Sequence, residues 1–246
     1  MTKYKLSLND QYFQSDDIEH GRLAKKFFDE LTTLFFEKNN KYHQDFYTLT
    51  GEQEWPFLYN EQMQYSMLSA AISQMTDMHL SEIPFSYLNH KNPDSLEDQS
   101  RTQRRIDFWC LHQASKAGKA INYFIEVKHS FYCTSEKSNP KPTQQLLKTN
   151  SVLKDQILSA KKELKNAWVG DGDVFMGIHI IPGYHPLNTS ATYTENDLLN
   201  EMPDFHANHG IQWISKTFKI EENFESQWDK NYNFVTIIGL VISKKR

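Results

Sequence analysis

Two charged residues, Glu126 and Lys128, interrupt the apolar segment INYFIEVKHS at positions 121–130. If this segment is a β-strand, side chains two residues apart point to the same face, so Glu126 and Lys128 stand side by side. Removing either charge from water is costly unless that charge is paired or coordinated. The pattern therefore predicts either a polar site on a buried strand or a plain ion pair on an exposed one.

A third charged residue, Asp107, lies in the preceding apolar segment, RRIDFWCLH at positions 104–112, and 18 residues separate it from Glu126. A polar turn joins the two segments, which together predict a hairpin with a long loop. Such a hairpin can bring both carboxylates to one end of a sheet. Two carboxylates can hold Mg²⁺ through oxygen ligands, and the metal lowers the pKa of bound water. A lysine beside them adds a compact positive charge.

Amphipathic segments lie on both sides of this hairpin in the sequence. Positions 61–78 predict a helix that Asn60 caps, followed by a short strand at 83–88. Positions 150–168 keep apolar residues at helical spacing and predict a second helix, with Gly170 as its stop.

The remaining segments predict further elements around this core. A helix is expected at 16–38, with Asp16 and Glu19 as a capping box and an end at residues 39–41. Loops are expected at 41–57 and 134–149. The other expected elements are strands at 173–181 (ended by Pro182-Gly183), 211–218 and 234–242 and a short helix at 195–200.

The order helix, strand, strand, strand, helix, strand, with the pattern D-x18-E-x-K set in it, resembles the PD-(D/E)xK nuclease superfamily. Here Ile106-Asp107 stands in place of Pro-Asp, a departure common in so divergent a group. The resemblance implies an α/β restriction-endonuclease-like fold, a three-layer core with a mixed central sheet flanked by helices. We expect a single domain over 1–246, with this core at about 60–181. The segments 1–59 and 182–246 are then N-terminal helical and C-terminal elaborations.

The resemblance also implies a function, that of a metal-dependent endonuclease hydrolysing phosphodiester bonds in DNA with Mg²⁺ or Mn²⁺ as cofactor. Asp107 and Glu126 would bind the metal, and Lys128 would assist the attacking water. The family often adds an acidic residue from the preceding helix, and Glu61 fits that position. Glu61 is equally well explained as an acidic residue that favours the helix dipole.

The alternative interpretation is structural. Lys128 would then bridge Glu126 and Asp107 without any metal, in a catalytically inactive module that binds nucleic acid or protein on the same fold. The pattern E-x-K alone has little value, since a second copy, Glu163-Leu164-Lys165, lies in the predicted helix 150–168. Side chains two residues apart on a helix do not face each other. The signal at Glu126 comes from its strand context.

The net charge of −4 gives no general attraction to nucleic acid, so phosphate contacts would require a local basic patch. Arg101, Arg104 and Arg105 lie within a few residues of Asp107 and are the candidate nucleic-acid-binding residues. For any single one of them, a solubilising strand edge is the simpler interpretation. Gln156, on the helix predicted after the hairpin, is a further polar residue that could point toward the site.

Cysteine usage and the apolar runs bear on location. Cys110 and Cys133 have no metal-ligand spacing, which favours a reduced cytoplasmic chain. The N-terminus lacks the apolar core of a signal peptide, and the longest apolar run, 234–242, is too short for a membrane helix. We expect a cytoplasmic protein with no membrane partner and leave its oligomeric state open, a homodimer being one option.

Four histidines could be imagined as zinc ligands: His179, His185, His206 and His209. No cysteine pair and no H-E-x-x-H helix accompany them, so we interpret them as loop or core residues.

Overall fold

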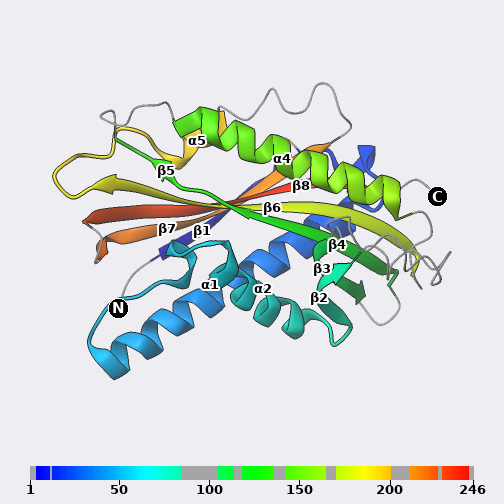
Figure 1. Ribbon diagram of the computed structural model, residues 1–246, viewed down its shortest axis with the longest axis horizontal. Helices are drawn as coiled ribbons and strands as arrows, with labels where there is room; N and C mark the ends of the chain where they lie inside the picture. Colours follow the sequence, from blue (N-terminus) through cyan, green and yellow to red (C-terminus); the bar gives the residue numbers. More distant parts are fainter. Residues whose placement is uncertain are drawn as a thin grey trace, which may run out of the picture.

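The computed structural model of the protein describes residues 4–11, 13–84, 105–113, 118–135, 142–164, 170–200, 211–226 and 229–243. Within these residues, eight strands form one mixed sheet in the order β1-β7-β8-β6-β4-β3-β2, with β5 beside β6 (Figure 1). The parallel pairs are β4 with β6 and β5 with β6. The strands are β1 (Tyr4–Asn9), β2 (His79–Pro84), β3 (Arg105–Gln113), β4 (Ala120–His129), β5 (Tyr132–Cys133), β6 (Gly172–Pro186), β7 (Gln212–Ser226) and β8 (Lys230–Ser243).

Helices cover both faces of this sheet, as Figure 1 shows: α1 and α2 lie on one side and α4 on the other. Phe27, Phe28 and Leu31 of α1 are fully buried in one core, and Leu153 and Ile157 of α4 in the other. The described helices are α1 (Gly21–Thr50), α2 (Glu61–Met75), α4 (Pro142–Glu163) and α5 (Glu195–Asn200), with 3-10 turns η1 (Ser15–Asp17) and η2 (Pro56–Leu58). The expected α/β class with a mixed sheet between helices is confirmed.

The first helix is longer than the sequence pattern predicted. It begins after His20, which makes no side-chain cap, so the capping box expected at Asp16 and Glu19 is wrong. It also runs through residues 39–41 and ends at Thr50, followed by Gly51, whose φ of 75° suits glycine. Asn39 does not stop the helix because its side chain is buried and donates to the carbonyl of Phe35 at 2.8 Å.

The helix after the hairpin likewise begins earlier, at Pro142 instead of Asn150. Proline suits the first turn of a helix, where its missing N–H would have no partner. The predicted loop over 134–149 is therefore wrong from residue 142 onward. The helix ends at Glu163, before the end predicted at residue 168.

Strand β6 passes through Pro182-Gly183, where the sequence predicted its end. Its pairing on one side ends with β4 at Ile180 and resumes with β5 at Gly183. Pro182 lies between these two pairings, where the lack of a backbone N–H on proline costs the sheet the least free energy.

The other predicted elements are largely confirmed. The hairpin strands are β3 and β4, the capped helix is α2, and the segments near 195–200, 211–218 and 234–242 are α5, β7 and β8. Asn60 caps α2 by accepting from the backbone N–H of Met63 at 3.3 Å. The strand predicted at 83–88 is β2, which begins at His79, and residues 85–88 lie outside the described part. Strand β1 was not predicted.

The segments outside residues 60–181 join the same sheet. β8 pairs with β6 along most of its length, β7 pairs with β8, and β1 pairs with β7. Thus both chain ends extend the sheet from the β6 side and leave the hairpin of β3 and β4 near the other edge.

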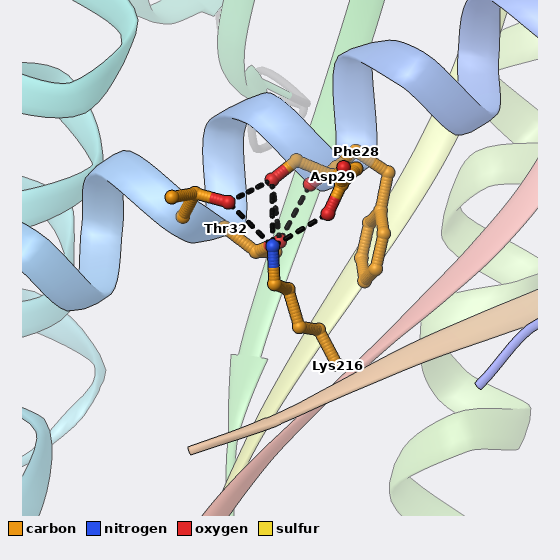
Figure 2. Close-up of polar contacts among 5 residues, drawn as sticks. Phe28, Asp29, Thr32 and Lys216 are labelled. Carbon is orange, nitrogen blue, oxygen red and sulfur yellow. Dashed lines mark hydrogen bonds and ion pairs between the residues drawn. The ribbon is translucent and has the colours of Figure 1, made fainter. Parts of the chain in front are cut away.

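A buried lysine fastens α1 to this extension. Lys216 of β7 has a side chain only 7% exposed, and its ammonium donates to the carboxylate and the carbonyl of Asp29 and to the hydroxyl of Thr33 (Figure 2). The hydroxyl of Thr32 donates to the carbonyl of Phe28 at 2.7 Å. Burial of the lysine is offset because all its protons find oxygen acceptors.

Replacing this lysine should destabilise the fold. We expect Lys216→Met to lower the free energy of unfolding by about 1–3 kcal/mol, because hydrogen bonds to a charged group are lost while Asp29 can still be hydrated. Chemical denaturation measures the effect. The matched control is Lys219→Met on the same strand, where an exposed ion pair with Glu195 should be worth less than about 1 kcal/mol. Equal losses in both variants would contradict a role for Lys216 in fastening α1.

Candidate functional site

The site lies where β3 and β4 separate. Their ladder ends at the pair Phe108 and Ile125, one residue before Asp107 and Glu126. Beyond that pair, the backbone N–H of Val127 donates to Asp107 Oδ2 at 2.7 Å. The carboxylate of Asp107 thus replaces the backbone acceptor that a continuing strand would have supplied.

The neighbouring edge strand, β2, is also irregular where it passes Asp107. The β2–β3 ladder pairs Ser81 with Phe108 and then Ile83 with Ile106, which sets Glu82 beside Asp107. Glu82 has a φ of 54°, a left-handed conformation that a non-glycine residue adopts at a cost. Backbone distortion therefore accompanies Asp107 on the β2 side as well as on the β4 side.

The two carboxylates predicted to act together are in contact. Asp107 and Glu126 come from adjacent antiparallel strands, are 9% and 3% exposed, and lie within hydrogen-bonding distance of each other. Burial and the charge of Asp107 raise the pKa of Glu126 to about 9. Burial also raises the pKa of Asp107, although hydrogen bonds from Val127 and Tyr65 act in the opposite direction. The pair therefore retains a proton at neutral pH unless a cation replaces it.

Lys128 connects this pair to α2. Its Nζ donates to Glu61 Oε1 at 3.2 Å and to the carbonyl of Val127 at 2.8 Å. The positive charge of Lys128 also lowers the pKa of both Asp107 and Glu126. Glu61 begins α2, so the helix brings this third carboxylate to the lysine. All four candidate residues of the predicted site thus lie together.

Tyr65 belongs to the same cluster, and sequence reasoning did not select it. Its hydroxyl donates to Glu61 Oε1 at 3.3 Å. Burial, with the nearby carboxylates of Asp107 and Glu61, raises the pKa of this hydroxyl. The spacing Glu61-x3-Tyr65, one helical turn, was the available signal.

The oxygen atoms of Asp107 and Glu126 are potential ligands of a divalent cation. In the described part of the chain, no group of three or more His, Cys, Asp or Glu residues could by itself hold a metal ion. Mg²⁺, however, is usually bound through one or two carboxylates and completes its shell with water and substrate oxygens. Asp107 and Glu126 supply two such ligands with an unmet need for positive charge, so the donor set fits Mg²⁺ or Mn²⁺.

A groove reaches Glu126 from the α4 side. It has a volume of about 670 Å³, and Arg105, Glu126, Gln156 and Lys162 are among the residues that line it. Gln156 therefore shares a surface with Glu126, and Lys162 lines the same surface.

The predicted arginine patch is described only in part. Arg105 begins β3, is exposed, and lies 3.6 Å from Glu82 in an ion pair. Arg101 and Arg104 lie outside the described residues.

A second buried polar cluster lies next to Lys128. His179 of β6 is opposite Lys128 and fully buried, with Nδ1 2.8 Å from Asn150 Oδ1 and Nε2 2.6 Å from Ser130 Oγ. Because an amide oxygen can only accept, Nδ1 carries the proton and Nε2 accepts from the serine hydroxyl. This cluster joins α4, β6 and the end of β4. Burial, with the nearby positive charges of His129 and Lys128, lowers the pKa of His179 to about 3.

Of the other histidines considered as zinc ligands, only His185 is described, and it belongs to no group of described residues that could hold a metal ion. His185 lies close to the carbonyl of Pro186, at 3.1 Å from its Nδ1. His206 and His209 lie outside the described residues.

Comparisons with protein-family models, with curated proteins and with solved structures found no match. The interpretation of the site therefore depends on its own geometry. Among the described helices, none has both the length and the apolar character needed to cross a membrane.

The raised pKa of Glu126 predicts a pH-dependent stability in the absence of divalent metal. Between its ordinary value of 4.5 and about 9, the native carboxyl keeps a proton that the unfolded chain releases. Stability should therefore fall as pH rises through this window, by up to about 1.4 kcal/mol per pH unit. Denaturation at several pH values in a chelator measures this slope. Glu126→Gln should flatten it, and Mg²⁺ should stabilise the wild type more at the higher pH. An equal slope in Glu126→Gln would contradict the assignment.

His179 predicts the opposite trend at acid pH. Its ordinary pKa is 6.5 and its native pKa is about 3, so below pH 6.5 the unfolded chain binds a proton that the native state does not. Stability should fall as pH decreases from 6.5 toward 3. We expect His179→Gln to be less stable at neutral pH but to lose less stability on acidification. Thermal melts of both proteins across this range test it, and parallel curves would show that another group is responsible.

Proposed function

We propose that this chain is a metal-dependent nuclease with a restriction-endonuclease-like core, hydrolysing phosphodiester bonds with DNA as substrate. The observation that carries the proposal is the contact of Asp107 with Glu126 where β3 and β4 separate, with Lys128 two residues further on. The order α2, β2, β3, β4, α4, β6 around this point supports the core assignment.

In this proposal Asp107 and Glu126 hold Mg²⁺ or Mn²⁺. The bound metal would neutralise phosphate charge and lower the pKa of a water molecule. Asp107 is held in place for this role, because the Val127 N–H donates to its carboxylate at 2.7 Å. This bond helps to fix its orientation beside Glu126.

Lys128 would act on the water or on the developing charge of the phosphate. Its contacts with Glu61 and the carbonyl of Val127 use two of its three protons. The remaining proton can be given to a water or a phosphate oxygen. Glu61 would then act as a positioning residue for Lys128.

The second candidate is a binding module without catalysis on the same scaffold. The ion pair of Lys128 with Glu61 favours it, since this contact forms without any metal. In that case, the carboxylates and the lysine serve only to hold α2 against β4. Both candidates fit a reducing compartment such as the cytoplasm, because Cys110 and Cys133 are buried free thiols.

A pair of substitutions separates the two functions. Glu126→Gln should abolish Mg²⁺ binding and lower cleavage of plasmid DNA by about a hundredfold or more, because the charge that holds the metal is gone. Lys128→Ala should lower cleavage similarly but keep metal binding, since an ammonium is not a ligand. Cleavage is measured on gels with Mg²⁺ or Mn²⁺, and metal binding by calorimetry. Glu163→Gln, at the last residue of α4 and in the second E-x-K copy of the sequence, is the matched control and should cleave normally.

Under the binding-module alternative, the result is different. Wild-type protein would neither cleave nor bind the metal, and Glu126→Gln and Lys128→Ala would only change the melting temperature. Cleavage that survives in both variants would show that these residues are not the catalytic centre.

A further inference from the structure

One oxygen atom of Glu61 contacts two side chains at the site. Its Oε1 accepts from Lys128 Nζ at 3.2 Å and from the hydroxyl of Tyr65 at 3.3 Å. A carboxylate that accepts a charge-assisted hydrogen bond from an ammonium is stabilised as an anion. In the described part of the chain, Glu61 also forms no metal-holding group of three with Asp107 and Glu126. These contacts favour a role of Glu61 in holding Lys128 over a role as a metal ligand.

Glu61 needs a further contact to stay in this conformation. It begins α2, and its side chain is 35% exposed, so water competes for its carboxylate. Holding a glutamate side chain in one conformation costs rotamer entropy, and a partly exposed ion pair offsets little of that cost. Tyr65 lies one helical turn further along α2, where its hydroxyl meets the same oxygen atom. The hydroxyl thus restricts the rotation of Glu61 and keeps Oε1 turned toward Lys128.

The ring of Tyr65 is fixed by the sheet. It packs edge-to-face on Phe108 of β3, with the ring centroids 5.4 Å apart. Phe108 is 1% exposed and directly follows Asp107 in the chain. Because burial and the nearby carboxylates raise the pKa of the Tyr65 hydroxyl, this group keeps its proton and remains a donor. Tyr65 therefore fixes Glu61 of α2 relative to the strand that carries Asp107.

We propose that Tyr65 is a positioning residue of the site: its hydroxyl orients Glu61, and Glu61 in turn holds the ammonium of Lys128. Lys128 is then placed to give its remaining proton to a water or a phosphate oxygen. The inference deepens the proposed function and rests on it for the catalytic role of Lys128. The arrangement of the three side chains can be tested without cleavage.

The first test is the kinetics of Tyr65→Phe, which removes the hydroxyl and keeps the ring on Phe108. With plasmid DNA and Mg²⁺, we expect kcat to fall by about threefold or more, since one hydrogen bond to a charged group is lost. KM and Mg²⁺ affinity should not change, because the hydroxyl contacts neither substrate nor metal. The matched control is Tyr59→Phe, which removes a hydroxyl that donates to Glu54 Oε1 at 2.7 Å and should cleave normally. A raised KM with unchanged kcat, or an equal loss in Tyr59→Phe, would overturn the proposal.

The second test needs neither metal nor cleavage. Acetylation of Lys128 by sulfosuccinimidyl acetate in a chelator, followed by peptide mass spectrometry, reports how often its side chain leaves Glu61. We expect Tyr65→Phe to raise this acetylation rate by about threefold, because Glu61 is held less firmly. Lys219, which pairs with Glu195 at 3.1 Å, is the internal reference and should keep its rate in every variant.

Glu61→Ala tests whether the hydroxyl acts through Glu61. This variant should itself raise the acetylation rate of Lys128 and lower kcat. Adding Tyr65→Phe to it should change neither quantity further, since the effects of residues that act through one shared contact do not add. A full further effect of Tyr65→Phe in the Glu61→Ala background would show that Tyr65 acts by another route and would overturn the proposal.

The positioning role and the nuclease function can fail separately. If the wild type never cleaves, but Tyr65→Phe speeds acetylation of Lys128 only when Glu61 is present, the arrangement is supported and the nuclease proposal fails. If the wild type cleaves and acetylation of Lys128 is unchanged in Tyr65→Phe, the nuclease proposal stands and the positioning role of Tyr65 is overturned.

Discussion

The candidate site depends on one hydrogen bond, from the backbone N–H of Val127 to the carboxylate of Asp107. A backbone donor buried at the point where two strands separate must find an acceptor, or the fold loses the free energy of a hydrogen bond. Here the acceptor is a side chain instead of a strand. That choice fixes Asp107 beside Glu126, and the resulting pair of carboxylates sets the electrostatics of everything around it.

Both helical layers contribute to the surroundings of Asp107 and Glu126. From one face, α2 supplies Glu61 and Tyr65, which contact Lys128 and Asp107. From the other face, α4 leaves a groove open at Glu126. Gly177, opposite Glu126 on β6, helps to bring α4 close to the sheet, because Leu153 occupies the space that a side chain would fill. Glu126 is thus accessible from the α4 side, while α2 contacts the site from the other face.

The helices are anchored to the sheet by buried polar contacts. Lys216 fastens α1 to β7, and His179 joins Asn150 of α4 to the end of β4. Both clusters are specific in geometry because nearly every polar atom in them must meet a partner of the right kind. They restrict where the two layers can sit on the sheet, which is what a site built from separate elements requires.

The sequence by itself determined the local features of this protein. Runs of apolar, β-branched and aromatic residues specified β3 and β4. The position of Glu126 and Lys128 in an apolar strand marked the site, and Asn60 marked the start of α2. Glu61 could also be selected, since it lies on the helix face with the buried Leu68 and Ile72.

The tertiary structure decided the features that depend on distant partners. Asn39 and Asn150 read as helix ends in sequence, but inside helices they bond to Phe35 and His179. Pro182 reads as a strand end, yet it lies between two pairing partners of β6. The position of Tyr65 at the site and the groove along α4 arise only when α2 and α4 pack on the sheet. The physical reason is the same in each case: a polar group's local preference is weak, and the partner that outweighs it comes from elsewhere in the fold.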